Sequence, residues 1–371
     1  MSMNYKKLGD YITQRREKNT TINLPICGVC REGLIPPKQQ DADISLYNVF
    51  YKNDFIFNPA RMELNSITLN TEYDKAICSS LYEIFYINDT SKLLPEFLFV
   101  QLKTANFVRF CEFQGQGSVR EYCRFANISE YPVIVPDLKE QEKIVNTYNA
   151  ITKRIQLKQK INENLEKTAQ CLFDKIYQNN ESWTDGVISD LGEIVSGATP
   201  STEIKEYFCQ NGIHWLSPKD LTSTGYKFIS KGETDITEAG YKSCSTKLMP
   251  KGTVLLTSRA PVGCLGIAEN EICTNQGFKS IIPNADIQTA YIYYFLKKEV
   301  EMLKQNASGT TFDEISGSVL KSLKCKIPPR NIALAFNEQC KKIFNQQRIT
   351  EKEIAELQEL KQLVISRISG M

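Results

Sequence analysis

The sequence lacks any hydrophobic run long enough to cross a membrane. No stretch of about 18 apolar residues occurs in the chain, and its first residues, MSMNYKKLGD, contain no apolar core of the kind found in signal peptides. Histidine occurs once, as His214, and CGVC at residues 27–30 is the one CxxC pair, whereas a zinc site needs four ligands. We therefore expect a cytoplasmic protein with no membrane segment, no metal and free cysteine thiols.

The sequence also lacks an excess of charge of either sign. Its 45 Lys and Arg residues nearly balance its 43 Asp and Glu residues, for a formal net charge of +2. Bulk charge therefore does not indicate a nucleic-acid-binding protein, and any such surface must be a local patch. Hydrophobic residues make up 42% of the 371-residue chain, which is sufficient for about two or three domains with sizeable cores.

What the sequence does contain is an internal repeat. At a shift of 192 residues, the stretch after Pro136 matches the stretch after Pro328 without a gap. The further identical pairs are Ile151 and Ile343, Lys160 and Lys352, Leu165 and Leu357, Gln170 and Gln362, and Ile176 and Ile368. The motifs LGD at residues 8–10 and LGE at residues 191–193 also match. We infer two copies of one plan, a globular region followed by a long helix.

Each copy predicts a mixed α/β region, so the fold class is α+β. Short β-rich runs between Gly, Pro and Asn predict strands within residues 251–269 and 276–284, whereas residues 95–110 and 290–305 have helical spacing. The long helices are expected over about 137–178 and 330–369, each roughly 60 Å long at 1.5 Å per residue.

An apolar stripe runs along each long helix and requires a partner helix. Because the two copies are related, we predict that they pair antiparallel as an intramolecular coiled coil, with a pseudo-twofold axis and one globular region at each end. The seam, also the surface expected to dock partners, comprises Ile144, Ile151, Ile155, Leu165, Leu172, Ile343, Ile354, Leu357 and Val364. Polar residues interrupt it at Lys158, Asn162, Gln347, Thr350 and Lys361.

The ordered motifs resemble those of the specificity subunit of type I restriction–modification systems. The first copy contains LGDYI, RREKN, CGVCREGLIP and GQGSVREYCRF, and the second contains LGEIVSGATPS, HWLSPKDL, GTVLLTSRAPVG and ASGTTFDEI. PDLKEQEKIV opens the most family-typical helix, whereas the second helix opens with RNIALAFNEQ and departs from this Gln-rich pattern. The resemblance implies target recognition domain 1 (1–136), conserved helical region 1 (137–180), target recognition domain 2 (181–328) and conserved helical region 2 (329–371).

The resemblance also implies a non-catalytic subunit that recognises double-stranded DNA. In this family each recognition domain reads one half of a bipartite, asymmetric site. The helices set the spacer between the halves and dock two DNA methyltransferase subunits, and restriction subunits can join that assembly. S-adenosylmethionine is then expected on the partner methyltransferase, and no cofactor on this chain.

The DNA-binding candidates are mainly basic and amide side chains on predicted turns. Arginine can read guanine, and Asn or Gln can read adenine, while basic and hydroxyl side chains can contact phosphates. For each residue the alternative is an ordinary surface position. The candidates are Arg15, Arg16, Lys18, Arg61, Arg120, Arg124, Lys219, Ser258, Arg259, Asn275, Gln276, Thr310 and Thr311. Trp215 is instead expected in the core, and Asp220 as a cap.

Two other functions are compatible with parts of the sequence. One is a stand-alone DNA methyltransferase, because FQGQG at 113–117 matches an F-x-G-x-G cofactor loop and NPAR at 58–61 faintly resembles N-P-P-[YF]. However, the residues before FQGQG predict a helix where a strand is needed, and NPAR lacks the second proline and the aromatic residue that hold a flipped base; we interpret it as the exit from a strand. The other function is a coiled-coil scaffold with two protein-binding modules.

Overall fold

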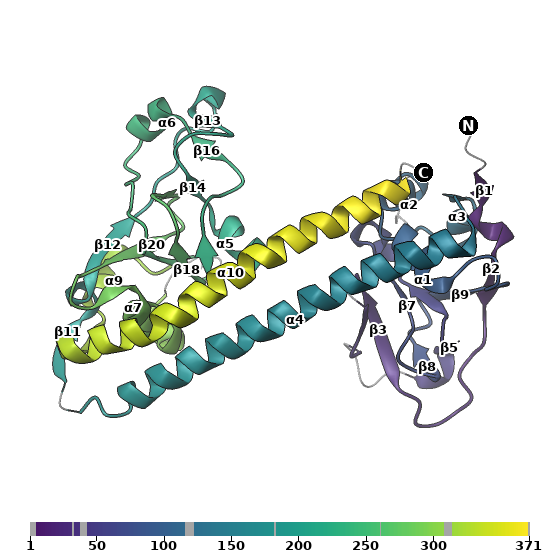
Figure 1. Cartoon of the computed structure of the whole chain (residues 1–371), viewed down its shortest axis with the longest axis horizontal. Helices are drawn as coiled ribbons and strands as arrows, with labels where there is room; N and C mark the ends of the chain where they lie inside the picture. Colours follow the sequence, from purple (N-terminus) through teal and green to yellow (C-terminus); the bar gives the residue numbers. More distant parts are fainter. Residues whose placement is uncertain are drawn as a thin grey trace. The chain divides into compact units, whose positions relative to one another are not determined.

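The structure is a computed structural model that describes residues 5–31, 33–37, 43–115, 122–181, 183–259, 261–307 and 314–369 (Figure 1). The chain divides into two compact units, Met1–Gln156 with Ala355–Met371 (unit 1) and Leu157–Ile354 (unit 2). Each unit therefore contains part of both long helices and one globular region. We call the globular regions module 1 (described residues 5–137) and module 2 (described residues 178–329).

The two long helices begin and end at equivalent positions of the repeat. Helix α4 spans Leu138–Tyr177 and α10 spans Arg330–Ser369, so both ends of α10 lie 192 residues after those of α4. A proline shortly precedes each helix, Pro136 in one case and Pro329 in the other, and proline is tolerated at a helix start but not in its interior. Both predicted helices are confirmed, with α4 one residue shorter at each end.

The predicted antiparallel pairing of the helices is confirmed within each unit. In unit 2, three polar contacts join the helices: Lys158 with Glu353, Asn162 with Glu351, and Glu166 with Gln347. Residue numbers rise along α4 and fall along α10 in this series, as antiparallel helices require. In unit 1, the ammonium of Lys361 lies 4.5 Å from the ring centre of Tyr148. Several of the polar side chains that interrupt the apolar seam are therefore the ones that bridge the two helices.

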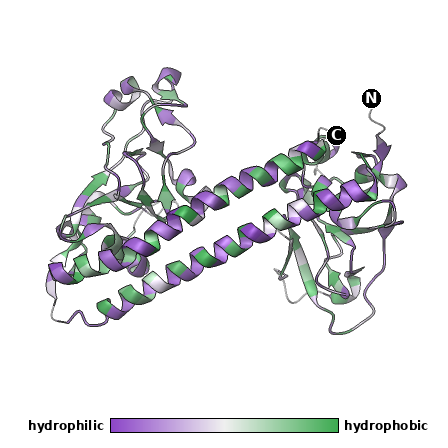
Figure 2. Cartoon of the chain, viewed as in Figure 1, coloured by the Kyte–Doolittle hydropathy of each residue, from purple (hydrophilic) through white to green (hydrophobic). Residues whose placement is uncertain are grey.

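The nine seam residues are all buried or half-buried. Hydrophobic and hydrophilic residues are interspersed along both long helices (Figure 2). Ile144 and Val364 pack in the core of module 1, whereas Leu172 and Ile343 pack in the core of module 2. The seam thus faces the modules as well as the partner helix. This corrects the expectation of partner docking for Ile144, Ile151, Ile155 and Ile354, because a buried side chain is not available to another protein. The other five seam residues are half-buried, and docking by them stays a prediction.

Module 1 is built on two four-stranded sheets with the orders β2-β9-β6-β7 and β4-β3-β8-β5. Its strands are β1 (Lys6–Lys7), β2 (Ile12–Arg15), β3 (Ile26–Cys30), β4 (Gly33–Ile35), β5 (Asn48–Tyr51), β6 (Phe55–Phe57), β7 (Ile67–Leu69), β8 (Lys75–Cys78), β9 (Glu83–Ile87) and β10 (Pro132–Val133). Its helices are α1 (Pro95–Gln101), α2 (Ala105–Gly115) and α3 (Phe125–Ser129), with 3-10 helices η1 (Leu8–Asp10), η2 (Ile44–Leu46) and η3 (Pro59–Leu64). The rings of Phe55 and Phe85 stack with centres 4.8 Å apart in its core.

Module 2 is built on a five-stranded sheet of order β12-β20-β17-β18-β15. Its strands are β11 (Thr184–Val187), β12 (Gly192–Ser196), β13 (Phe208–Cys209), β14 (Trp215–Leu216), β15 (Phe228–Ile229), β16 (Asp235–Ile236), β17 (Val254–Leu256), β18 (Leu265–Ala268), β19 (Cys273–Thr274), β20 (Lys279–Pro283) and β21 (Lys324–Ile327). Its helices are α5 (Pro218–Thr224), α6 (Glu238–Ser243), α7 (Gln288–Lys298), α8 (Val300–Gln305) and α9 (Gly317–Ser322), with 3-10 helices η4 (Ile188–Asp190) and η5 (Lys205–Tyr207).

The two modules share one strand order, which extends the sequence repeat to the globular regions. The order β2-β9-β6-β7 in module 1 corresponds to β12-β20-β17-β18 in module 2. In each module a short first strand also pairs with the last strand before the long helix, β1 with β10 and β11 with β21. The predicted match of LGD with LGE is wrong in detail, because Leu8 begins η1 and donates from its N–H to the Tyr131 carbonyl oxygen just as Ile188 begins η4 and donates to that of Leu323. LGE instead begins at Leu191, directly after η4, and leads into β12. At Gly192 a Cβ atom would lie 2.3 Å from the backbone oxygen of Ile282, so this motif requires glycine.

Each long helix is anchored to its module by one buried amide side chain. Gln141 of α4 accepts a hydrogen bond from the backbone N–H of Leu94 at 2.9 Å, at the start of α1. Asn337 of α10 accepts one from the N–H of Ala290 at 2.7 Å and donates to the carbonyl oxygen of Ile287 at 2.7 Å, at the start of α7. The second helix thus replaces the Gln-rich opening of the first with an asparagine one turn further along.

The expected helices at residues 95–110 and 290–305 are each split in two. The break between α1 and α2 is stabilised by Thr104, whose hydroxyl accepts a hydrogen bond from the N–H of Phe107 at 3.3 Å, and α7 gives way to α8 at Glu299. The expected strands of residues 251–269 and 276–284 are confirmed as β17, β18 and β20. Among the helices of the described residues, none is long and apolar enough to span a membrane.

Candidate functional site

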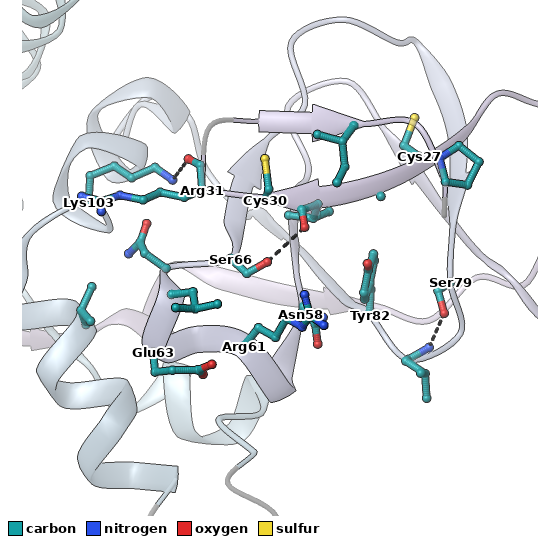
Figure 3. Close-up of a pocket in the computed structure, with 18 of the residues that line it drawn as sticks. Cys27, Cys30, Arg31, Asn58, Arg61, Glu63, Ser66, Ser79, Tyr82 and Lys103 are labelled. Carbon is teal, nitrogen blue, oxygen red and sulfur yellow. Dashed lines mark hydrogen bonds between the residues drawn. The ribbon is translucent and has the colours of Figure 1, made fainter. Parts of the chain in front are cut away.

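Module 1 contains a cavity of about 1060 Å³ between β3, η3, α2 and one residue of α10 (Figure 3). Four cationic side chains line it, Arg31, Arg61, Lys103 and Arg109, together with two acidic ones, Glu63 and Glu112. Asn58, Tyr47 and Tyr82 add amide and phenol groups, and Gln362 is the residue from α10. The lining is therefore net positive and rich in groups that donate hydrogen bonds, which suits an anionic ligand that also carries hydrogen-bonding groups.

The cations of this cavity differ in how far they are already engaged. The ammonium of Lys103 donates to the carbonyl oxygens of Arg31 and Ile67, each at 2.8 Å, and Arg109 donates to the Asn106 side chain at 2.6 Å. By contrast, neither guanidinium of Arg31 and Arg61 has an ion pair or a side-chain hydrogen bond within the described parts of the chain. Arg31 and Arg61 are also exposed, so they are the cations of the cavity that remain available to a ligand.

Arg61 is held at the cavity by the short helix η3. The side-chain oxygen of Asn58 accepts a hydrogen bond from the N–H of Ala60 at 3.1 Å, and Pro59 occupies the first turn. The helix ends at Asn65, which has a left-handed φ of 52° and donates from its buried amide to the Leu102 carbonyl oxygen at 2.7 Å. NPAR thus leaves strand β6, as interpreted from the sequence, and presents the Arg61 side chain near Asn58 and Tyr82 (Figure 3).

The basic cluster predicted in module 1 is engaged within the protein. Arg15 forms two hydrogen bonds with the buried carboxylate of Asp54, at 2.6 and 3.1 Å, and its guanidinium lies 4.7 Å from the ring centres of Tyr51 and Tyr86. Its neighbours are less constrained, since Arg16 donates to the Gln14 side chain at 2.8 Å and Lys18 to the Asn48 side chain at 2.7 Å. Arg15 is therefore placed as a structural residue, because freeing its guanidinium would leave Asp54 unpaired.

The two remaining arginines predicted in module 1 lie away from the cavity lining or outside the description. Arg124 precedes α3, donates to the Glu83 carboxylate at 3.3 Å and lies 5.2 Å from the ring centre of Tyr122. Arg120 lies outside the described residues. Of the candidates in this module, Arg61 lines the cavity, whereas Arg31, Lys103 and Arg109 were missed. Arg31 follows strand β3 in a turn-forming CREG segment, and this pattern could have identified it.

In module 2, the segments singled out in the sequence converge on the turn at Asn275 and Gln276. The Asn275 side chain accepts a hydrogen bond from the N–H of Gly277 at 2.8 Å, and its backbone N–H donates to the Leu216 carbonyl oxygen at 2.8 Å. The amide oxygen of Gln276 accepts a hydrogen bond from the hydroxyl of Thr199. GATPS, HWLSPKDL and TNQG therefore meet at one place, although they are separated by up to about eighty residues in the sequence.

Ser258 and Arg259 of the TSRAP segment lie close to this turn, but Ser258 does not have the exposed side chain expected of a DNA contact. Ser258 is fully buried, and its backbone N–H donates to the Gly277 carbonyl oxygen at 2.8 Å. The expectation that its hydroxyl is available at the surface is therefore corrected. Arg259 is about one third exposed and lies 3.8 Å from the Glu314 carboxylate, which is also 3.6 Å from the Lys279 ammonium.

The other candidates of module 2 have varied surroundings. Lys219 is exposed and lies 3.1 Å from the Glu233 carboxylate, while Thr310 and Thr311 lie outside the described residues. Asp220 acts as the expected cap, since its carboxylate accepts from the Ser217 N–H at 2.7 Å. Trp215 is half-buried and donates from its indole N–H to the Ala198 carbonyl oxygen at 3.0 Å.

A buried polar cluster, which sequence reasoning missed, joins module 2 to both long helices within unit 2. The ammonium of Lys227 forms an ion pair with Glu166 of α4 and donates to Gln347 of α10 and to the Tyr294 hydroxyl, each at 2.9 Å. Lys297 pairs with the same Glu166 carboxylate. We call these five residues the Lys227 cluster. The polar interruption of the seam at Gln347 was the available sign of it.

The charges of the Lys227 cluster stabilise one another. Burial lowers the pKa of Lys227 to about 8, against the opposing effect of Glu166. Burial alone would raise the pKa of Glu166, but Lys227 and Lys297 outweigh it and lower that pKa to about 2. Both groups are therefore charged at neutral pH, and the pair fixes the junction between the module and the helices.

The exposed apolar residues of the long helices are distinct from the seam. In unit 2 they are Leu157 and Ile161 of α4 and Ile349 of α10, at 53%, 46% and 54% exposure. In unit 1 they are Leu138 of α4 and Leu360 and Leu363 of α10, at 36%, 46% and 65% exposure. These side chains are therefore the apolar groups of the long helices that remain accessible at the surface of their units.

Two α+β modules that share a four-strand order, each joined to a 40-residue helix, define an internally duplicated protein of two modules. The family model described as the type I restriction modification DNA specificity domain matches residues 33–167 and 180–360. The chain belongs to this family.

Individual relatives are specificity subunits of type I restriction enzymes. The chain is 47% identical over 150 residues to the MjaIX subunit of Methanocaldococcus jannaschii. The matched segment is 40% of this chain and 34% of that subunit. It is 21% identical over 380 residues to the HindI subunit of Haemophilus influenzae, covering 81% and 82%. The crystal structure of the type I restriction–modification S subunit from M. genitalium has the same fold, with a TM-score of 0.62, 13% identity and coverage of 99% and 96%.

Proposed function

We propose that the chain is the DNA sequence-specificity subunit of a type I restriction–modification complex. Each module reads one half of a bipartite, asymmetric site in double-stranded DNA, and the chain itself catalyses no reaction. The observation that carries this proposal is the duplication, because two modules of the same strand order present different side chains at their surfaces. One scaffold that carries two different sets of contacts suits a target with two unlike halves.

The chemistry of the two modules supports reading by direct contact. In module 1, Arg31 and Arg61 are free to neutralise phosphates or to contact guanine, and Asn58 offers an amide near Arg61 (Figure 3). In module 2, the turn at Asn275 and Gln276 presents side-chain NH2 groups that can donate to base edges, while both amide oxygens accept hydrogen bonds within the module. Arg259 adds a partly exposed guanidinium. The near-neutral net charge of +2 fits a subunit whose partners share the phosphate contacts.

The long helices set the spacer and bind partners in this proposal. Leu157, Ile161 and Ile349 are exposed apolar side chains suited to docking a DNA methyltransferase subunit, and two such subunits, with S-adenosylmethionine bound to them, complete the methylating complex. Restriction subunits would join that complex. This chain contributes recognition and geometry, and the partner contributes the methyl transfer.

The test is methylome sequencing of cells with and without the chain. We expect one bipartite motif with a fixed spacer to be methylated only when the chain is present. Purified chain incubated with labelled S-adenosylmethionine and DNA serves as the control, and it should transfer no methyl group. Methylation by the chain alone would contradict the non-catalytic role, and a methylome that does not change with the chain would contradict the proposal as a whole.

A further inference from the structure

The cavity of module 1 is lined by a residue that lies far outside that module in sequence. Gln362 belongs to α10, more than two hundred residues after the last residue of module 1, yet it lines the same cavity as Arg31 and Arg61. Both the cavity and this part of α10 belong to unit 1. Gln362 is exposed, so its amide is available to a ligand in the cavity.

The backbone that carries Gln362 is held firmly against module 1. Ile365 and Ile368 are 6% and 4% exposed and pack in the same core as Ile144 and Tyr148 of α4. The preceding residue, Lys361, is half-buried, with its ammonium 4.5 Å from the ring centre of Tyr148. Gln362 therefore projects from a fixed helix, and binding in the cavity need not order a loop to use it.

The cavity rim and the helix also share one electrostatic environment. Burial lowers the pKa of Lys361, and the positive charge of Arg31 lowers it further. Burial raises the pKa of Tyr148, and Arg31 opposes that rise. Arg31 thus acts electrostatically on a residue of each long helix, and Gln362 of α10 is the long-helix residue that lines the cavity.

We propose that Gln362 takes part in reading the first half-site, as an amide supplied by the second long helix to DNA bound in the cavity of module 1. This inference rests on the proposed function. A glutamine amide offers one acceptor and two donor hydrogens, which match the edge of adenine in the major groove or a phosphate oxygen. Recognition of the first half-site is then not contained in residues 1–136, so transferring those residues to a related chain that lacks a glutamine at this position of its second helix would transfer the specificity incompletely.

A reconstituted complex of the full chain with its methyltransferase subunits tests this proposal. Methylation is measured on duplexes in which each base pair of the first half-site is varied in turn, while the second half-site and the spacer are kept. We expect Gln362→Ala to lose discrimination at one or two positions of the first half-site, by about 5- to 100-fold, and to leave the second half-site unchanged. Gln339→Ala is the matched control, because Gln339 is also an exposed glutamine of α10 but lies in unit 2 and away from the cavity.

Charge variants separate contact with DNA from a loss of structure. We expect Gln362→Lys to bind DNA more tightly and Gln362→Glu more weakly, with a salt dependence that is steeper for the lysine variant. Wild-type discrimination in Gln362→Ala would overturn the proposal, and so would an equal loss of methylation at variants of both half-sites, which would assign Gln362 a structural role. A wild-type complex without preference for any bipartite site would instead overturn the proposed function.

Discussion

The ammonium group of Lys227 is buried in module 2, and its hydrogen-bond partners belong to three helices, α4, α7 and α10. We predict that Lys227→Met lowers the free energy of unfolding of the full chain by about 3 kcal/mol, because it leaves the Glu166 carboxylate with Lys297 as its remaining ionic partner in the cluster. Chemical denaturation followed by circular dichroism measures this change.

The control for this prediction is Lys219→Met. Lys219 also pairs with a glutamate, at 3.1 Å from Glu233, but both side chains are about three quarters exposed. An exposed pair contributes about 0 to 1 kcal/mol, so this variant should unfold almost as the wild type does. Equal stability of the two lysine variants would show that the Lys227 cluster does not hold the junction of module and helices.

Glu166 should make the stability of the chain depend on acid pH. Its pKa is lowered from 4.5 to about 2 in the folded protein, so the unfolded chain binds more protons than the folded one between these values. The stabilisation, about 3 kcal/mol, is thus present above pH 4.5 and is lost as the pH falls towards 2. We predict that wild type exceeds Glu166→Gln in free energy of unfolding by about this amount at pH 7, and that urea titrations at pH 4 and 3 show the difference shrinking. A constant difference would contradict the assignment.

At the residue scale, the sequence predicts which side chains have suitable chemistry but not which are free to use it. Arg15, in a basic cluster, and Arg61, an isolated arginine on a predicted turn, are both predicted from the sequence to contact DNA. Arg15 is committed to Asp54, 39 residues later in the chain, whereas Arg61 lies at an open cavity. Ser258 and Gln276 likewise differ in exposure because of strand contacts between distant segments. Such partners follow from tertiary packing, which local patterns do not encode.

At the element scale, the long helices were predictable and the short ones were not. An apolar stripe sustained over 40 residues and a proline before each start define α4 and α10 almost to the residue. The breaks at Thr104 and Glu299 were missed because both flanking segments have helical spacing, and the end of each first helix depends on local capping and packing. The cavity of module 1 is assembled from β3, η3, α2 and α10, a combination that no single segment indicates.

The amide anchors provide a test at this scale. We predict that Asn337→Ala destabilises the chain by about 1 to 3 kcal/mol, because the buried N–H of Ala290 and the carbonyl oxygen of Ile287 lose their hydrogen-bond partner. Hydrogen exchange of the first-turn amides of α7 should also become faster. Asn345→Ala is the control on the same helix, since Asn345 is exposed. Unchanged exchange at Ala290 in Asn337→Ala would show that this anchor does not position α7.

At the scale of the whole molecule, the shift of 192 residues relates more than the helices. At this shift, β10 of module 1 corresponds to β21 of module 2, and α3 corresponds to α9. The first strands of the two modules are related by a slightly smaller shift. The difference lies in the strands between, where module 1 has a second four-stranded sheet and module 2 has two two-stranded ones. The parts that repeat are therefore the strands and short helices next to the long helices and the four-strand order of the main sheet, and the parts that differ are the additional strands of each module.

The length of the long helices should determine the spacer between the half-sites. Removing four residues from α4 near Lys158 shortens that helix by about 6 Å, which corresponds to one or two base pairs at about 3.4 Å each. It also rotates the residues after the deletion by about 40° at 100° per residue, close to the twist of about 35° of one base pair. Length and twist thus change in the same sense for the DNA and the helix.

We therefore predict that this deletion yields a complex that methylates the same two half-sites with a spacer shorter by one or two base pairs, as read by methylome sequencing. A variant with Lys158, Gln159, Lys160 and Ile161 all replaced by alanine is the control, because it removes the same side chains without changing the length of the helix, and it should keep the original spacer. The deletion also shifts the contacts of α4 with α10, such as that between Asn162 and Glu351, so it should lower stability as well. Altered half-sites with an unchanged spacer would contradict the division of labour between modules and helices, since the modules retain every one of their own residues in the deletion variant.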